Sequence, residues 1–144
     1  MFAVDTNVLV YASDRSFGEH ARCRDRLEGW RRQAMPWFLT WNVLYEYLRV
    51  VTHPKVLVRP WSASAAWGFV QALLASPALT VLRPTERHDV ILAQTLAEVP
   101  ELRGNLLFDT HTAVLLREHG VRQIVTRDID FARFGFLEVV DPLA

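Results

Sequence analysis

The sequence predicts an α/β fold in which helices cover both faces of a central parallel sheet, giving three layers. Short strand-like segments alternate with helical segments along the chain, an order typical of parallel sheets. The chain has 144 residues, of which 51% are hydrophobic, so one sizeable core can form. It contains no internal repeat and no low-complexity segment. We therefore expect one domain over residues 1–144.

The first predicted strand covers the apolar residues 2–4 and ends at Asp5. Apolar side chains then recur at helical spacing over residues 8–12, which predicts a helix directly after the strand. Residues 18–32 mix basic and acidic side chains around a few apolar ones, as in a solvated helix. Pro36 cannot continue that helix.

A second predicted strand covers residues 37–39. Thr40 and Asn42 are alternative caps for the helix that follows and runs to about residue 51. The His53-Pro54 pair closes this helix, because a residue that precedes proline avoids the helical region.

The second half of the chain repeats the alternation of helices and strands. Residues 62–75 are predicted to be helical and residues 79–82 to form a strand, followed by a helix over 86–99. Asp109 opens a largely apolar helix over residues 110–119, which Gly120 stops. Strand-like segments at 123–126 and 137–140 complete the sheet.

Acidic residues recur where the predicted strands end. Asp5 follows the first strand, and ligands of open α/β sheets bind in the crevice beyond the carboxyl ends of the strands. Asp5 alone fits a helix cap equally well. Glu46 lies mid-helix among apolar and aromatic neighbours, so we expect its carboxylate to risk burial and to need a partner. Arg49, three residues on, is the ordinary helix-surface choice.

Three further carboxylates have the same ambiguity when each is considered alone. Asp109 suits the start of a helix, where the dipole favours negative charge. Asp128 and Asp130 follow a predicted strand, and turns use such residues too. The conjunction is more informative than any member, because all these positions can converge on one crevice.

A cluster of anions is tolerable only with cations between them or with raised pKa values. Magnesium and manganese prefer oxygen ligands, whereas zinc sites recruit histidine or cysteine, and the 5 histidines here show no ligand spacing. An ion held by a few carboxylates keeps positions open for phosphate oxygens and water. Phosphodiester hydrolysis needs that arrangement.

These residues resemble the PIN-domain nucleases. Asp5-Thr6-Asn7, Glu46, Asp109 and the Thr126–Phe131 segment match the four acidic positions of that family in order. Other segments are similar to the toxin ribonucleases of VapBC-type toxin–antitoxin pairs. They are Val8–Ala12, His20, Leu48–Pro54 and Pro142-Leu143.

The resemblance implies a Rossmann-like α/β/α sandwich, an endoribonuclease dependent on Mg²⁺ or Mn²⁺, a homodimer, and inhibition by a cognate antitoxin in a type II pair. It assigns Asp5, Glu46, Asp109 and Asp128 as catalytic and metal-binding residues. Asp130 is a further candidate metal ligand, and the choice between Asp128 and Asp130 as the fourth ligand stays open.

The late helix departs from the family pattern, because Thr110 and Thr112 flank His111 where many members carry small apolar residues. His111 lies two residues after Asp109 and is a candidate for contact with the site. A packed or solvent-facing histidine is the alternative.

Contacts with RNA must come from local patches, since 16 basic and 16 acidic side chains cancel. Arg127 and Arg133, beside the acidic residues, are the predicted phosphate contacts. Trp30, Trp37 and Trp67 suggest more large apolar surface than one small core absorbs, which predicts a partner surface.

A cytoplasmic location is expected from three features. Cys23 is the only cysteine and so forms no internal disulfide. The N-terminus lacks the features of a signal peptide. No apolar stretch approaches the roughly 20 residues of a membrane-spanning helix.

Two alternatives belong to other classes. A phosphatase-like hydrolase would use Asp5 as a nucleophile, but the haloacid-dehalogenase-like pattern requires a second aspartate where this chain has Asn7. A non-catalytic PIN-like binding module is disfavoured by the presence of all four acidic positions.

Overall fold

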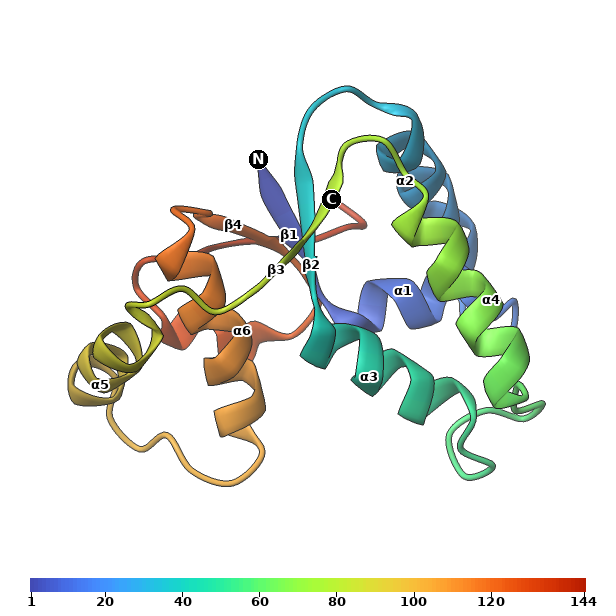
Figure 1. The fold of residues 1–144 in the computed structure, drawn as a ribbon. Coiled ribbons are helices and arrows are strands. Elements are labelled where there is room, and N and C mark those ends of the chain that lie inside the picture. Colours follow the sequence, from blue (N-terminus) through green and yellow to red (C-terminus); the bar gives the residue numbers. More distant parts are fainter.

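The computed structural model describes residues 1–144 and contains one sheet of five parallel strands in the order β3-β2-β1-β4-β5 (Figure 1). The bounds of the strands are β1 Phe2–Val4, β2 Trp37–Thr40, β3 Leu79–Leu82, β4 Gln123–Val125 and β5 Glu138–Val140. All lie within the predicted strand segments or extend them by one residue. The predicted Rossmann-like parallel sheet is thereby confirmed.

Six α-helices and one short 3₁₀ helix connect the strands. Their bounds are α1 Thr6–Ser13, α2 His20–Arg32, α3 Trp41–Val51, α4 Ala63–Leu74, α5 His88–Glu98, α6 Leu106–Glu118 and η1 Ile129–Arg133. The N-cap of α3 is Thr40, whose hydroxyl accepts from the backbone N–H of Val43. None of these helices has the length and apolar content needed to cross a bilayer.

The start of α6 differs from the prediction. The helix begins at Leu106, and Asp109 lies inside its first turns instead of opening it. The first turn forms through tighter contacts, because the backbone N–H of Leu107 donates to Gly104 O at 3.1 Å and that of Phe108 donates to Asn105 O at 3.1 Å. Asp109 therefore has a fixed helical backbone.

Two apolar cores lie on the two faces of the sheet. The larger core holds 19 buried residues, drawn mainly from β1, β2 and helices α1 to α4. The smaller core holds 10 buried residues and packs α6 and η1 against the other face. In Figure 1, α2 and α4 lie on one side of the sheet and α5 and α6 on the other, as the three-layer prediction requires.

The prediction that tryptophans form a partner surface is wrong for two of the three residues. Trp30 and Trp37 lie in the larger core with ring centroids 6.1 Å apart, and Trp30 also packs against Phe2 at 5.1 Å. Both rings are needed there, because α2 has only three buried side chains with which to cover β1 and β2. Trp67 on α4 remains 40% exposed.

Candidate active site

Asp5 lies at the point where the strand order of the sheet reverses. The chain passes from β1 to α1 at this residue, while β4 is paired beside β1 and ends at Val125. The backbone N–H of Asp5 donates to Val125 O at 3.0 Å, which brings Thr126 next to the Asp5 side chain. In open α/β sheets this reversal point opens a crevice at the carboxyl ends of the strands.

Three donors hold the Asp5 carboxylate, which is only 7% exposed. The backbone N–H of Thr6 donates to Oδ1 at 2.8 Å, so Asp5 also caps α1. The Thr126 hydroxyl donates to Oδ2 at 2.7 Å, and Asn7 Nδ2 donates to the same oxygen at 3.2 Å. Asp5 is therefore both the N-cap of α1 and a candidate site residue.

Thr126 connects the two sides of the reversal point. Its hydroxyl accepts from Asn7 Nδ2 at 2.9 Å and from the backbone N–H of Asp128 at 2.9 Å, while it donates to Asp5. Thr126 thus fixes both Asp5 and the segment that carries Asp128. Thr126 and Asn7 belong to the sequence motifs, but no structural role was predicted for either. Their spacing from Asp128 and Asp5 was the available signal.

Glu46 reaches the same cleft from α3, but its side chain is 45% exposed, so the expected burial was wrong. The buried residues of α3 are Val43, Leu44, Tyr47 and Val51, and Glu46 lies beside this buried face. Its Oε2 accepts from the Thr6 hydroxyl at 3.1 Å, and its Oε1 lies 3.8 Å from Arg49 Nη2. Glu46 therefore has the expected helix-surface partner and also faces the cleft.

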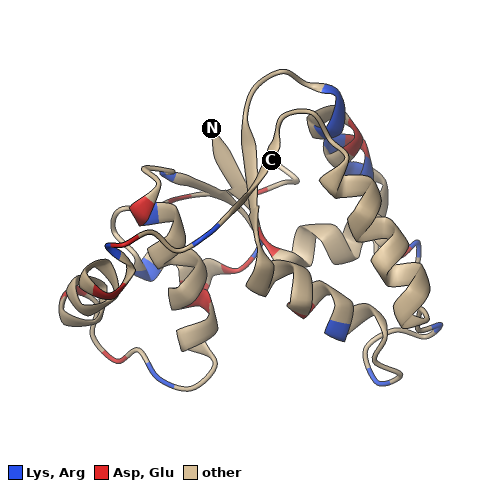
Figure 2. Cartoon of the chain, in the orientation of Figure 1, with Lys and Arg blue, Asp and Glu red and all other residues tan.

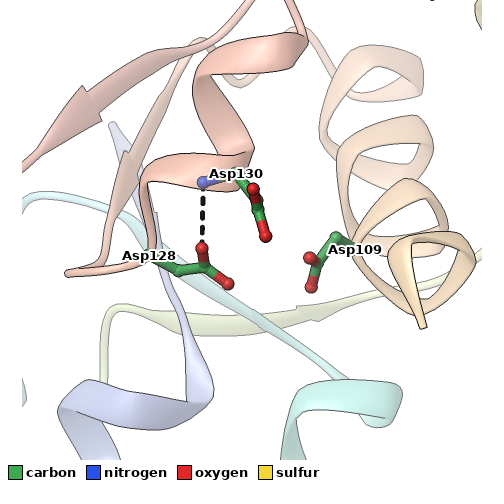
Figure 3. A group of neighbouring side chains, drawn as sticks. All are labelled: Asp109, Asp128 and Asp130. Carbon is green, nitrogen blue, oxygen red and sulfur yellow. Dashed lines mark hydrogen bonds between the residues drawn. The ribbon is translucent and has the colours of Figure 1, made fainter. Parts of the chain in front are cut away.

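Asp109, Asp128 and Asp130 lie together in a cluster. One carboxylate oxygen of each lies within 4.8 Å of the others, and Figure 3 shows the side chain from α6 pointing toward the two beside η1. Asp128 caps η1 by accepting from the backbone N–H of Asp130 at 2.9 Å. The cluster joins two segments that are separate in the sequence.

The structure brings the predicted carboxylates to one surface. Asp5, Glu46, Asp109 and Asp128 line a single cleft. Asp130 lines an adjoining groove that shares the last three of these residues. Neither His111 nor the predicted phosphate contacts are among the lining residues.

Each of those other predicted residues has a neighbour of its own. The His111 ring packs edge-on against His88, with centroids 5.7 Å apart. Arg127 lies within 3.4 Å of Glu19 and 3.8 Å of Asp141, and Arg133 lies 3.5 Å from Asp130. These arginines lie beside carboxylates and outside both hollows, so their contact with phosphate stays a prediction.

The electrostatics of the cleft are those of crowded anions. Burial raises the pKa of Asp5 to about 6, and repulsion from Glu46 and Asp128 adds to this, although the donors Thr126 and Thr6 oppose it. The pKa of Asp109 rises to about 7 through burial and then repulsion from the other carboxylates of the cleft. Burial and mutual repulsion of the carboxylates are therefore the main causes of the raised pKa values in the cleft.

The donor set fits a hard divalent cation. Every ligand candidate is a carboxylate oxygen, and no histidine or cysteine lines the cleft or the adjoining groove. Mg²⁺ and Mn²⁺ prefer this chemistry. A positive charge among Asp109, Asp128 and Asp130 would also relieve the repulsion that raises the pKa of Asp109.

Comparisons with known proteins identify the family of this chain. The sequence pattern of the family described as PIN domain matches residues 2–137. The chain is 40% identical over 143 residues to "VapC ribonuclease Mb2897" of Mycobacterium bovis, covering 99% of this chain and 96% of the relative. It is 36% identical over 134 residues to "Ribonuclease VapC37" of Mycobacterium tuberculosis, covering 93% and 92%.

Solved structures share the fold at lower identity. The Mycobacterium tuberculosis toxin VapC20, described as cleaving the sarcin-ricin loop, superposes with a TM-score of 0.69 at 18% identity and covers 96% of this chain and 98% of its own. VapBC2 of Rickettsia felis, bound to a promoter DNA fragment, gives a TM-score of 0.69 at 17% identity and covers 96% of each chain.

Proposed function

This chain belongs to the PIN-domain family, and we propose that it is an endoribonuclease that hydrolyses RNA with Mg²⁺ or Mn²⁺ and is the toxin of a type II toxin–antitoxin pair. The observation that carries the proposal is the convergence of Asp5, Glu46, Asp109 and Asp128 on one cleft. Relatives named VapC ribonucleases, which align over nearly the full chain, support the choice of RNA as substrate.

Within this proposal Asp109, Asp128 and Asp130 would hold the ion. Their mutual approach within 4.8 Å supports including both Asp128 and Asp130, which the sequence left as alternatives. When bound, the ion supplies activation of a water molecule and neutralisation of phosphate charge. Asp5 and Glu46 line the same cleft as Asp109 and Asp128.

The chain's own hydrogen bonds position these carboxylates. The Thr6 hydroxyl fixes Glu46, and Thr126 with Asn7 fixes Asp5, so both anions are oriented before substrate arrives. Pre-oriented charge costs no reorganisation during the reaction.

We propose a protein antitoxin as the partner on the apolar arm of the cleft. Val10, Tyr11, Phe17, Val50 and Val56 line this arm next to the carboxylates. An amphipathic segment of the antitoxin would bury these side chains and close the site. The Rickettsia felis neighbour is itself described as a VapBC assembly, which supports a partner of this kind.

The family resemblance further supports a homodimer and a cytoplasmic location, where RNA is available. Cys23 is a free thiol buried in the larger core, as in proteins of a reducing compartment. Light scattering of the purified chain tests the homodimer, and a mass of one chain at all concentrations would contradict it.

A cleavage assay tests the activity. The purified protein should cut single-stranded or looped RNA only with Mg²⁺ or Mn²⁺ and leave 5′-phosphate ends, because activated water attacks the phosphorus. Cleavage that persists undiminished in excess chelator would contradict the proposal.

No observation favours the phosphatase alternative. Asn7, which occupies the position where that mechanism needs a second aspartate, donates to Asp5 and to Thr126. Its amide has a structural role that a carboxylate could not take.

A further inference from the structure

A second groove leaves the carboxylate cleft between α3 and the start of α6. It shares Glu46, Asp109 and Asp128 with the cleft, so the two hollows form one continuous surface. The hydroxyl of Thr112 on α6 accepts from Asn42 Nδ2 on α3 at 2.5 Å, which ties the two walls together. This hydrogen bond helps to hold α3 and α6 in place on either side of the groove.

The two arms of this surface differ in charge. The apolar arm has no lysine or arginine among its lining residues, whereas the groove has Arg49 and Arg103. Figure 2 shows the corresponding basic segments on α3 and on the loop before α6. Of the two arms, only the groove offers lining cations to an anionic chain that reaches the carboxylates.

Both guanidinium groups have donors to spare. The Arg49 side chain is 65% exposed, and its carboxylate contact is Glu46 at 3.8 Å. Arg103 is exposed and belongs to none of the ion pairs of the chain. A guanidinium has five N–H donors in a planar fork that suits phosphate oxygens.

Two aromatic side chains also line the groove. Tyr45 is 69% exposed and Phe108 is 66% exposed, and they come from opposite walls. Exposed rings beside a cationic groove are the usual platform on which unpaired bases stack. Neither ring belongs to the two apolar cores.

We propose that this groove binds single-stranded RNA on one side of the cleaved bond, with Arg49 and Arg103 on backbone phosphates and Tyr45 and Phe108 stacked against bases. The inference rests on the proposed ribonuclease function and extends it to residues outside the carboxylate cluster. The strand must be single there, because paired bases present no free ring face. Sequence tolerance is expected along the groove, since every base has such a face.

The salt dependence of binding tests the phosphate contacts. In an Asp5→Asn background, which prevents cleavage, a labelled oligouridylate of about a dozen nucleotides is titrated at several salt concentrations. Arg49→Gln and Arg103→Gln should each weaken binding and each reduce the slope of log K against log[salt] by about 0.7, the value for one lost phosphate contact on a single strand.

Arg24→Gln is the matched control, because it removes the same charge from an exposed position of α2, away from the groove. It should leave the slope unchanged. If Arg103→Gln, which breaks no ion pair of the protein, behaves like Arg24→Gln, the proposal is overturned.

The aromatic contacts require a different readout. Tyr45→Ala and Phe108→Ala should each weaken oligouridylate binding by about tenfold without changing the salt slope. Trp67→Ala, which removes an exposed aromatic ring from α4, should leave affinity unchanged. Sedimentation of the same variants decides the competing role: a lost dimer with unchanged affinity per chain would make these rings a subunit interface and overturn the proposal.

Cleavage kinetics separate this inference from the proposed function. Arg103→Gln should raise KM more than it lowers kcat, because its contact forms when substrate binds. If the unmodified protein cuts RNA and Arg103→Gln keeps its KM, the groove assignment fails alone. If the unmodified protein cuts no RNA with either metal, the ribonuclease function itself fails.

Discussion

Asp5 and Asp109 line one cleft, but their carboxylates are held in different ways. Asp5 accepts hydrogen bonds from the Thr6 N–H, the Asn7 amide and the Thr126 hydroxyl. No hydrogen bond contributes to the pKa of Asp109, which is raised by burial and then by the charges of the other carboxylates, with Asp5 first among them. The Asp5 carboxylate is thus satisfied by hydrogen bonds, whereas the Asp109 carboxylate is surrounded by charges that repel it.

The comparison separates two causes of a raised pKa. Burial is the largest cause at both residues, raising the pKa of Asp5 to about 6 and that of Asp109 to about 7. At Asp5 the donors oppose the shift, whereas at Asp109 every other cause adds to it. A bound cation would therefore relieve the repulsion at Asp109 most, whereas hydrogen bonds already hold Asp5 in position.

The largest effects are expected on catalysis, where the two sides should behave alike. Asp5→Asn and Asp109→Asn should each reduce the rate of RNA cleavage at least about a hundredfold, because loss of a group that only supports a metal ligand already costs tenfold to a hundredfold. Asp89→Asn, on the exposed first turn of α5, should leave the rate unchanged. Cleavage time courses measure this, and an active Asp109→Asn protein would remove Asp109 from the site.

Thr126→Val tests the satisfied side of the comparison. The substitution keeps the side-chain shape but leaves Asp5 Oδ2, Asn7 Nδ2 and the Asp128 N–H each short of one partner. Buried groups without partners destabilise, so we expect a loss of about 2 kcal/mol in the free energy of unfolding. Urea denaturation measures it, and Thr80→Val at an exposed position of β3 is the control. Equal stability of the two variants would show that the network contributes nothing.

The sequence predicted the Asp5 side and the Asp109 side unequally. Composition was sufficient for β1 and for the residue at its end, because an apolar run followed by a capping aspartate is a local signal. The start of α6 was placed too late, because exposed Leu107 and Phe108 do not show the periodicity of a buried helix face. Asp109 was therefore predicted as a site residue, but it was wrongly placed at the start of the helix instead of inside it.

The role of Thr126 depends on which strands are neighbours. Thr126 reaches Asp5 only because β4 pairs with β1. The two residues are 121 positions apart in the sequence. Local patterns contain no information on strand order. The exposure of Glu46 was missed for a related reason, since the composition around it did not show which side of α3 faces the core.

Stability of the metal-free protein should fall as the pH rises from about 4 to about 7. Folded Asp5 and Asp109 titrate near 6 and 7, against an ordinary value of 3.8, so the folded state binds more protons in this window. As the pH rises, the folded state releases these extra protons, and the free energy of unfolding therefore falls. Because water screens the partly exposed Asp109, we expect a loss on the order of 1 to 2 kcal/mol.

Urea denaturation in chelator at pH 5 and pH 8 measures this change. His111, whose pKa is lowered by burial and by His88, acts in the opposite direction, so the difference between the protein and Asp109→Asn isolates the carboxylate effect. Added Mg²⁺ should restore stability at pH 8, where the carboxylates are ionised. A pH dependence that is identical in Asp109→Asn would contradict the assignment.

The smallest effect is the most direct contrast between the two sides. Asp109→Asn removes a repelling charge that accepts no hydrogen bond, so at neutral pH and without metal it should stabilise the fold by on the order of 1 kcal/mol. Asp5→Asn should give no gain, because the new amide would place its N–H donors against Asn7 Nδ2 and a Thr126 hydroxyl that already accepts two hydrogen bonds. Asp130→Asn is the intermediate case, since relief of repulsion is offset by the lost ion pair with Arg133 at 3.5 Å.

Melting curves with and without Mg²⁺ measure all three variants. The stabilisation by Mg²⁺ should shrink most in Asp109→Asn, because an ion that binds only the folded state stabilises it through its occupancy. A destabilised Asp109→Asn protein beside a stabilised Asp5→Asn protein would reverse the assignment of the two sides.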